Sequence, residues 1–568
     1  MNNNDLKNLL ISILLSTMIL GSWQYFYESP RKAIIEEQQQ INVQKKLDQE
    51  QKLIDKSNKT FEQSTQSNQE KVGTININTD KLTGTISLRG LRFNELFLKK
   101  YKENINNDSP LVQLFSSKEN LAYFSEFGWI NSSEGSSFSV PDKNTIWKCN
   151  QSELTPGKSI ECYWQNEHLI KFIFDISIDS DYLFTIKQTV INNSSNAINL
   201  ATYGRIYKAE AEAKQFAILH EGIIGVFSGV LKESTYEDLS KSRQETYTNT
   251  PGSWAGITHK YWLSALIPDN KIASKTNLVA SDSNGQDNYN INYISNDLII
   301  NPGKQETSIN HLFAGAKEEK LLAKYAQEND FVLFDRAIDF GIFYFITKPL
   351  FLLISYFYSL LGNFGLAILA VTLTLKLLMY PLANKSFKSM AKMKELQPKM
   401  EQLKQRYAED KIKFNQEVMT LYKKENVNPA SGCLPLLIQI PIFFSLYKVI
   451  FISIEMRHAP FYGWIKDLSA QDPTSIWNLF GLMPWHSLGT LDIGLWPIIM
   501  GVTMFIQQSL NPAPTDPVQA TVMKFMPLVL MVMLYSLPSG LMIYWSFSNI
   551  LSILQQYMIT KDTRKAKV

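Results

Sequence analysis

Apolar residues are concentrated in the C-terminal part of this 568-residue chain, and this uneven distribution limits its fold more than any other feature. From about Phe340 onward Leu, Ile, Met and Phe crowd the sequence, whereas residues 28–330 are polar and rich in Asn, Ser and Lys. The first region suits lipid and the second suits water, so we expect a membrane part and a soluble part. The net charge of +3 is too small to indicate a nucleic-acid partner, and no DNA binding is expected.

Six segments are long and apolar enough to be candidate membrane-spanning helices. The first, from Leu6 to Tyr27, has no small-residue cleavage site after it, so we expect an uncleaved signal-anchor rather than a cleaved signal peptide. The other five are residues 363–380, 433–454, 495–510, 524–537 and 539–558, with Pro538 separating the last two. The segment that precedes them, up to Leu361, is expected to be an amphipathic helix at the membrane surface.

Loop charge predicts the orientation. Residues 384–425 contain eleven Lys and Arg side chains, and the tail after residue 560 adds Lys561, Arg564, Lys565 and Lys567. Short loops rich in these residues stay in the cytoplasm. Counting spans from them places both termini in the cytoplasm and the polar domain outside.

The polar region contains many short runs with a period of two, such as residues 74–78 and 169–176, separated by Asn, Gly and Ser clusters. We therefore expect a β-sandwich over residues 73–330, preceded by a flexible tether at 28–72. Cys149 and Cys162 flank a turn-like segment within this region. They either form a disulfide, as an oxidising compartment would allow, or remain two free thiols.

Several polar side chains fall inside the predicted spans, and Lys376 is the most costly of them. A lysine at mid-membrane costs about 2.5–3.5 kcal/mol on insertion scales. It either extends its side chain to the nearby cytoplasmic surface or lines a water-filled cavity. Further candidates for lining such a cavity are Gln439, Gln507, Gln508, Ser546, Ser548, Asn549, Gln555 and Gln556.

The cytoplasmic segment 383–427 has apolar positions at helical spacing and many basic residues. This pattern predicts a Met-rich helical hairpin, which is either a solvated linker or a docking arm for a client or for the ribosome. Its candidate docking residues are Lys392, Lys394, Lys399, Lys404 and Arg406.

Signatures of catalysis are missing from the sequence. It has no Gly-rich phosphate loop, no Gly-x-Ser-x-Gly turn and no histidine spacing typical of metal ligands, so we expect no enzyme, cofactor or metal. A transporter would need inverted repeats and carboxylates within the spans, and neither is present. A sugar-binding or sugar-isomerising domain would need a cluster of histidines and carboxylates, for which the candidates are His168, His220, His259, His311 and Glu221.

The membrane half resembles the YidC/Oxa/Alb family of membrane protein insertases. The matching motifs are KLLMYPL (376–382), MAKM and QPK (390–399), NPASGCLPLLIQIPIF (428–443), DLSAQDP (467–473), GVTMF (501–505), FMP (525–527) and PSGL (538–541), followed by Tyr544, Ser548 and Asn549. The N-terminal anchor and the large β-domain are similar to the Gram-negative branch, which implies an inner-membrane location and a periplasmic domain.

This resemblance implies an α-helical polytopic protein with six transmembrane helices, a five-helix insertase core and a periplasmic β-sandwich. The domains would be the anchor (1–27), the tether (28–72), the sandwich (73–330), the interfacial region (331–361), the core (362–560) with its hairpin (383–427), and the basic tail (561–568). In the family a positively charged groove, open to cytoplasm and lipid, receives the client.

Within that groove Lys376 takes a position that is often Arg, and Trp545 replaces the second Tyr of an expected pair. The expected groove residues are Lys376, Thr372, Gln439, Gln507, Gln508, Tyr544, Trp545, Ser548 and Asn549. The implied role is an insertase and chaperone without enzymatic activity. The implied partners are nascent membrane-protein clients, the Sec translocon with its accessory subunits, the ribosome and membrane lipids.

Overall fold

The computed structural model describes residues 73–118, 121–132, 138–209, 219–283, 286–407, 410–425, 427, 434–483, 492–512 and 517–565. The predicted signal-anchor (1–27) and tether (28–72) lie outside these residues, as does the start of the predicted span at 433. The end of the basic tail is outside them too.

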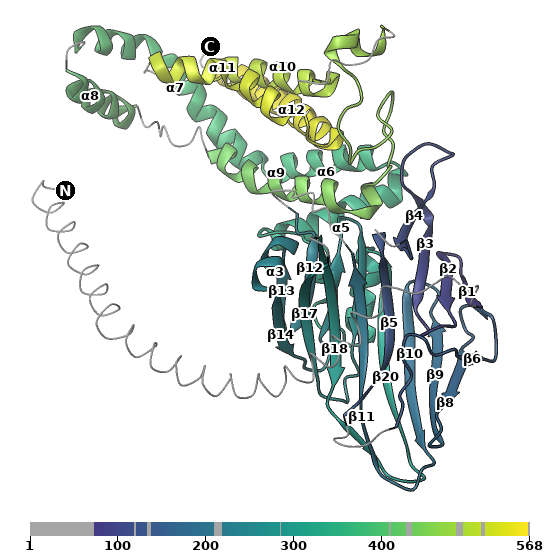
Figure 1. The fold of residues 1–568 in the computed structure, drawn as a ribbon. Coiled ribbons are helices and arrows are strands. Elements are labelled where there is room, and N and C mark those ends of the chain that lie inside the picture. Colours follow the sequence, from purple (N-terminus) through teal and green to yellow (C-terminus); the bar gives the residue numbers. More distant parts are fainter. Residues whose placement is uncertain are drawn as a thin grey trace, which may run out of the picture. The chain divides into compact units, whose positions relative to one another are not determined.

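Residues 74–316 form two β-sheets, which face each other as a sandwich (Figure 1). The larger sheet has the order β14-β17-β18-β11-β5-β3-β2-β1-β7, with β19 beside β11 and β4 beside β3. Its strands are β1 (Thr74–Asn78), β2 (Leu82–Ser87), β3 (Phe93–Lys102), β4 (Leu111–Phe115), β5 (Tyr123–Asn131), β7 (Glu153–Leu154), β11 (Ile198–Lys208), β14 (Gln244–Thr248), β17 (Ser274–Ser283), β18 (Gln286–Ser295) and β19 (Leu298–Ile300).

The second sheet has the order β13-β12-β15-β16-β20-β10-β9-β8-β6. Its strands are β6 (Lys148–Cys149), β8 (Ile160–Gln165), β9 (Ile170–Ile178), β10 (Leu183–Asn192), β12 (Gly222–Phe227), β13 (Val230–Ser234), β15 (Trp254–Thr258), β16 (Trp262–Ile267) and β20 (Gln305–Ala316). A short helix, α3 (Tyr236–Ser242), joins β13 to β14.

Burial alternates along several strands, and their buried residues form part of the core between the sheets. In β9 every second residue from Ile170 to Ile178 is buried, as the period-two pattern predicts. Aromatic rings from the two sheets meet in this core: Phe93 of β3 lies 5.1 Å from Phe184 of β10, centroid to centroid. Trp129 of β5 similarly lies 4.7 Å from Phe174 of β9. The predicted sandwich is therefore present.

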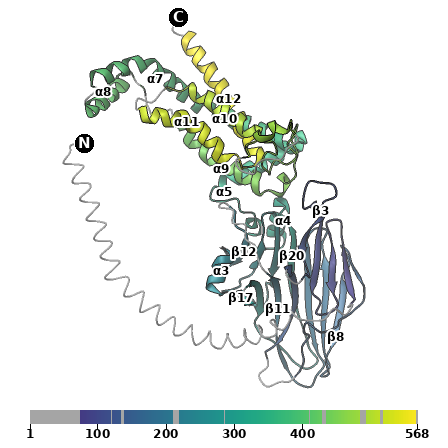
Figure 2. The same ribbon diagram turned by 45° about the horizontal axis from the view of Figure 1, so that its top comes forward.

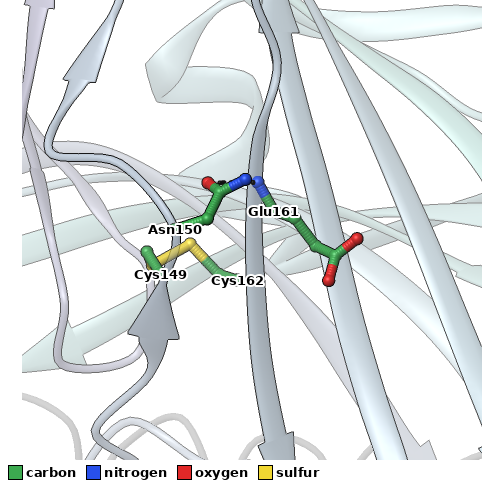
Figure 3. The surroundings of a disulfide bond; sticks show 4 residues. All are labelled: Cys149, Asn150, Glu161 and Cys162. Atoms are coloured by element: carbon green, nitrogen blue, oxygen red, sulfur yellow. Dashed lines mark hydrogen bonds between the residues drawn. A yellow bond between two sulfur atoms is a disulfide. The ribbon is translucent and has the colours of Figure 1, made fainter.

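A disulfide joins Cys149 and Cys162 at the edge of the second sheet (Figure 3). The two residues are direct partners in the antiparallel pairing of β6 with β8, which brings their side chains to the same side of the sheet. Asn150 Oδ1 also accepts a hydrogen bond from the Glu161 backbone N–H at 3.1 Å. Of the two alternatives left by the sequence, the structure has the bonded one.

Replacing both cysteines with serine should lower the free energy of unfolding of this domain by about 2–3 kcal/mol, because the unfolded chain loses a loop constraint. Thermal unfolding of the purified full-length protein, with and without dithiothreitol, measures this change. The reductant should shift the wild-type transition downward and leave the double variant unaffected. Equal transitions for both proteins in both buffers would contradict a structural role for this bond.

Helices occupy the rest of the described chain. They are α4 (Glu319–Glu328), α5 (Tyr344–Leu361), α6 (Phe364–Leu378), α7 (Tyr380–Arg406), α8 (Lys411–Lys424), α9 (Leu434–Ile452), α10 (Leu495–Ser509), α11 (Pro517–Leu534) and α12 (Ser539–Lys565). Short 3-10 turns lie at Phe334–Ala337, Ile454–Met456 and Ile476–Gly481. Helices α6, α9, α10, α11 and α12 coincide with the five segments predicted as spans after residue 361.

By length and composition alone, one described helix, α5, is apolar enough to cross a membrane. A second results if α6 and α7, which are bent by 66°, count as one span. Shorter apolar helices lie at Ile438–Ile452 and Ala520–Leu534. The sequence predicts α5 as an interfacial helix, and its composition also suits a span.

Local sequence explains where α5, α6 and α7 begin and end. Gly362 ends α5 in a left-handed conformation (φ 66°), which glycine adopts without steric cost. The Asn363 side chain then caps α6 by accepting the Leu366 backbone N–H at 3.1 Å. Pro381, in the first turn of α7, has no N–H with which to continue the ladder of α6, so the chain bends there.

Candidate functional site

A cavity of about 390 Å³ lies among helices α6, α7, α9, α10, α11 and α12. Amide, hydroxyl and ammonium groups line part of it, and thioether and aromatic side chains line the rest. The lining residues are Lys376, Met379, Ala383, Phe387, Met390, Met393, Gln439, Met504, Gln507, Gln508, Asn511, Pro512, Met523, Met526, Trp545, Ser548, Asn549, Ser552 and Gln555. None of these residues is acidic, so the fixed charge of the described lining is positive.

Lys376 supplies that charge from the last turn of α6. Its Nζ donates a hydrogen bond to Ser552 Oγ at 2.7 Å, and Ser552 in turn donates to the Ser548 carbonyl at 2.9 Å. Within the described part of the chain no carboxylate lies within salt-bridge distance of Lys376. The ammonium is thus held in the cavity wall by a neutral partner and can still donate to an incoming anionic group.

Two more hydrogen-bonded groups tie α12 to its neighbours around the cavity. Gln439 of α9 donates to Tyr544 Oη at 2.6 Å and lies 3.3 Å from Ser548 Oγ. Asn549 donates to Thr503 Oγ1 of α10 at 3.2 Å. These bonds satisfy part of the polar surface, which would otherwise be costly in an apolar setting.

Most of the groove residues predicted from sequence line this cavity, and two lie behind it. Thr372 is buried, and its hydroxyl donates to the Ile368 carbonyl at 2.7 Å. Tyr544 is buried as well, and its hydroxyl accepts a hydrogen bond from Gln439, which lines the cavity. Trp545 lines the cavity and packs 4.6 Å from the ring of Phe443. Among the other polar candidates, Gln555 lines the cavity, whereas Ser546 bonds to the Met542 carbonyl and Gln556 to Leu510 and Asn511.

The sequence-based prediction missed Ser552 and most of the methionines. Ser552 lies one helical turn after Ser548, so the spacing of Trp545, Ser548 and Asn549 along α12 could have indicated it. The cavity methionines are Met379, Met390, Met393, Met504, Met523 and Met526. Their flexible thioether side chains suit contact with varied apolar partners.

The predicted cytoplasmic hairpin is formed by α7 and α8, which contact each other (Figures 1 and 2). Phe387, Met390, Met393 and Leu396 of α7 form a buried cluster with Val427 and with Ile559 of α12. The candidate docking residues Lys392, Lys394, Lys399, Lys404 and Arg406 are exposed, and Lys399 pairs with Glu425 at 2.8 Å. Because α7 also contributes to the cavity lining, the hairpin and the cavity share one apolar surface.

Both halves of the chain match known protein families. Residues 356–566 match the family model described as 60Kd inner membrane protein, and residues 74–353 match the one described as YidC periplasmic domain. The membrane protein insertase YidC of Rickettsia felis is 49% identical over 566 residues, covering 98% of this chain and all of that protein.

Two solved structures show more distant likeness. A crystal structure of an active YidC insertase with its first transmembrane domain resolved is 19% identical, with a TM-score of 0.36, over 86% of this chain and 93% of that one. A galactose mutarotase related enzyme from Lactobacillus acidophilus is 10% identical, with a TM-score of 0.32, over 42% of this chain and 97% of the enzyme.

Proposed function

Because this chain belongs to the YidC family of membrane protein insertases, we propose that the cavity among its helices receives the polar tail of a client during insertion. The family predicted from the sequence motifs is confirmed, and with it the function as a membrane protein insertase that carries a periplasmic domain. Its curated relatives are named for insertion, which is not an enzymatic reaction. The observation that supports the proposal is the Lys376 ammonium, which faces a cavity without an acidic partner among its described residues.

The first step of the proposed mechanism is electrostatic. A client tail that carries Asp or Glu enters the cavity, and Lys376 attracts its carboxylates. At an effective dielectric constant near 20, a charge pair 4 Å apart contributes up to about 4 kcal/mol before desolvation is subtracted. Lysine acts here as a point charge with three hydrogen-bond donors and lacks the planar fork of arginine. It should therefore bind carboxylates in many orientations.

The second step concerns the uncharged part of the tail. Each unpaired backbone group that enters hydrocarbon costs several kcal/mol. Gln439, Gln507 and Asn549 can exchange hydrogen bonds with that backbone, because they line the cavity from three helices. The tail therefore crosses part of the bilayer without full transfer into lipid.

The third step releases the client. We propose that its apolar segment first contacts the methionines of α7, α10 and α11, which adapt their shape to different sequences. Transfer into lipid then proceeds with burial of apolar surface, at about 25 cal/mol per Å². Client partitioning supplies the free energy, since the sequence contains no nucleotide-binding motif.

The finer assignments rest on the family and on loop charge. We propose that the protein lies in the bacterial inner membrane with both termini in the cytoplasm and the sandwich in the periplasm. The anchor, tether, sandwich, interfacial region, core and basic tail keep the boundaries given above. Working alone or beside the Sec translocon, it would dock ribosomes and clients on the α7–α8 hairpin through Lys392, Lys394, Lys399, Lys404 and Arg406.

Photo-crosslinking tests the place of the client tail. A photoreactive amino acid at Met526, which lines the cavity, should capture the acidic tail of a stalled client in vesicles. The same group at Val529, an exposed position on the same helix, should capture lipid or the apolar segment but not the tail. Equal capture of the tail from both positions, or capture from Val529 alone, would contradict the proposed path. A depleted host that the wild-type chain fails to rescue would contradict the function itself.

Ser552 is expected to hold the Lys376 ammonium in its productive position. Ser552→Ala removes the hydrogen bond that positions the ammonium but leaves the charge in place. Insertion of a client with an acidic tail should therefore slow by about threefold to tenfold, less than on loss of the lysine itself. Ser546→Ala is the matched control on the same helix, because among the described residues that hydroxyl bonds to the Met542 carbonyl within its own helix and not to the lysine.

A further inference from the structure

A second cavity, of about 300 Å³, lies in the β-domain and shares no lining residue with the cavity among the helices. Tyr123 of β5, Lys208 at the end of β11, Glu221 before β12 and His259 between β15 and β16 contribute to its wall. Tyr261 and Trp262 also line it. The sequence marked His259 and Glu221 as candidates for a ligand site, and the fold brings these two together.

Three polar groups of this cavity lack full hydrogen-bonding partners within the described chain. The Lys208 ammonium lies 4.5 Å from the Tyr123 ring centroid and has no carboxylate or hydrogen-bond acceptor in contact among the described residues. One oxygen of Glu221 accepts the Lys260 backbone N–H at 2.6 Å, and its other oxygen has no described donor. The ring nitrogens of His259 likewise make no hydrogen bond to a described residue.

The protonation states follow from burial. Burial lowers the pKa of the Lys208 amine to about 8, with the nearby Glu221 opposing the shift, so the amine is still mostly charged at neutral pH. Burial, with Lys208 and Lys317 adding to the effect, lowers the pKa of His259 well below its usual value. At neutral pH the wall therefore offers a cationic donor and an imidazole that both donates and accepts, beside the carboxyl group of Glu221.

We propose that this cavity binds a polyhydroxylated ligand, either a free sugar or the glycerol-based headgroup of a lipid. Neighbouring hydroxyl groups can accept from Lys208 and donate to Glu221 at the same time, which a purely anionic or cationic ligand cannot do. Tyr261 and Trp262, whose centroids lie 6.0 Å apart, add apolar surface for the carbon skeleton.

A lipid headgroup is the second source of such hydroxyl groups, because this cavity adjoins the helical region. Tyr261 Oη donates to the Phe451 carbonyl at the end of α9, and the Lys260 ammonium lies 3.5 Å from the Phe451 ring centroid. Tyr261 and Lys260 thus both contact α9, the helix that also carries Gln439. A free sugar and a lipid headgroup would present the same hydroxyl chemistry to Lys208 and Glu221.

Ligand-observed saturation-transfer NMR on the full-length protein in detergent tests the proposal. The probes are D-glucose, D-galactose and glycerol 1-phosphate, and at least one should bind. Binding of a hexose alone identifies a free sugar, and binding of glycerol 1-phosphate alone identifies a lipid headgroup. The absence of binding by all three probes would overturn the proposal.

Variants connect the signal to the cavity. Lys208→Met keeps the length of the side chain and should weaken binding at least about tenfold, because a charged hydrogen bond is lost. Glu221→Gln is a second, nearly isosteric variant with the same expected direction. Lys171→Met is the matched control, since Lys171 also lies over a tyrosine ring, at 4.8 Å from Tyr163, but outside the cavity. Wild-type binding by folded Lys208→Met and Glu221→Gln proteins would refute the assignment. The insertion assay is independent of this result.

Discussion

Lys376→Ala should reduce insertion of a client with an acidic external tail by at least about tenfold, which corresponds to about 1.4 kcal/mol of lost attraction. The lysine is the single charged side chain in the described lining of the core cavity, and its ammonium donates a hydrogen bond there to Ser552. Removing it leaves the client carboxylates without a counter-charge in a setting of low dielectric constant. The measurement is protease accessibility of the tail in a host depleted of the wild-type protein and complemented with each variant.

Variants of Lys376 that keep either its charge or its length separate the electrostatic contribution from the packing contribution. Lys376→Arg should retain most of the insertion, whereas Lys376→Met, which keeps the length of the side chain, should fail as Lys376→Ala does. Changing the client's Asp and Glu to Asn and Gln should remove the difference among the variants, because no carboxylate is then left to attract. If Lys376→Met inserts the acidic client at the wild-type rate, the charge has no role and the lysine merely reaches the membrane surface.

Periodicity and local signals predicted most of the architecture. The apolar runs located α6, α9, α10, α11 and α12, and the alternation in β1 and β9 indicated a sheet buried on one face. The predicted helix end at Leu361 and the predicted span from residue 363 agree with α5 and α6, and the left-handed Gly362 and the Asn363 cap set this boundary within one turn of the chain. Such signals need no knowledge of tertiary structure.

Features that depend on contacts across the fold were harder to predict from the sequence. Thr372 and Lys376 lie one turn apart on α6, yet the structure directs Thr372 to its own helix backbone and Lys376 to Ser552, 176 positions away. Serine is also common in membrane helices as a helix-packing residue, so Ser552 alone carries little signal. The β-domain cavity combines β11, the start of β12 and the turn after β15, and strand order in a sandwich cannot be read from the spacing of its residues.

Glu126→Ala should destabilise the β-domain by about 3–5 kcal/mol, more than loss of the disulfide. Glu126 of β5 and Arg205 of β11 are direct cross-strand partners, with Oε1 and the guanidinium nitrogen 3.0 Å apart. The two side chains are only 10% and 2% exposed. Removing the carboxylate therefore leaves a buried guanidinium whose lost hydration is no longer offset by its ion pair.

A double-mutant cycle distinguishes the cost of breaking this ion pair from the cost of leaving a cavity. If the charge dominates, Glu126→Ala combined with Arg205→Met should be more stable than Glu126→Ala alone, because methionine can pack against the Phe124 and Tyr207 rings that now flank the arginine. Urea unfolding of the full-length protein measures the stability of each of the four proteins in the cycle. Limited proteolysis of the β-domain reports the unfolding. Glu237→Ala, which breaks the exposed pair with Lys241, is the control and should change little. If the double variant is instead destabilised by the sum of the two single-variant losses, the two side chains contribute to stability through packing alone. The buried ion pair then has no special role in holding β5 against β11.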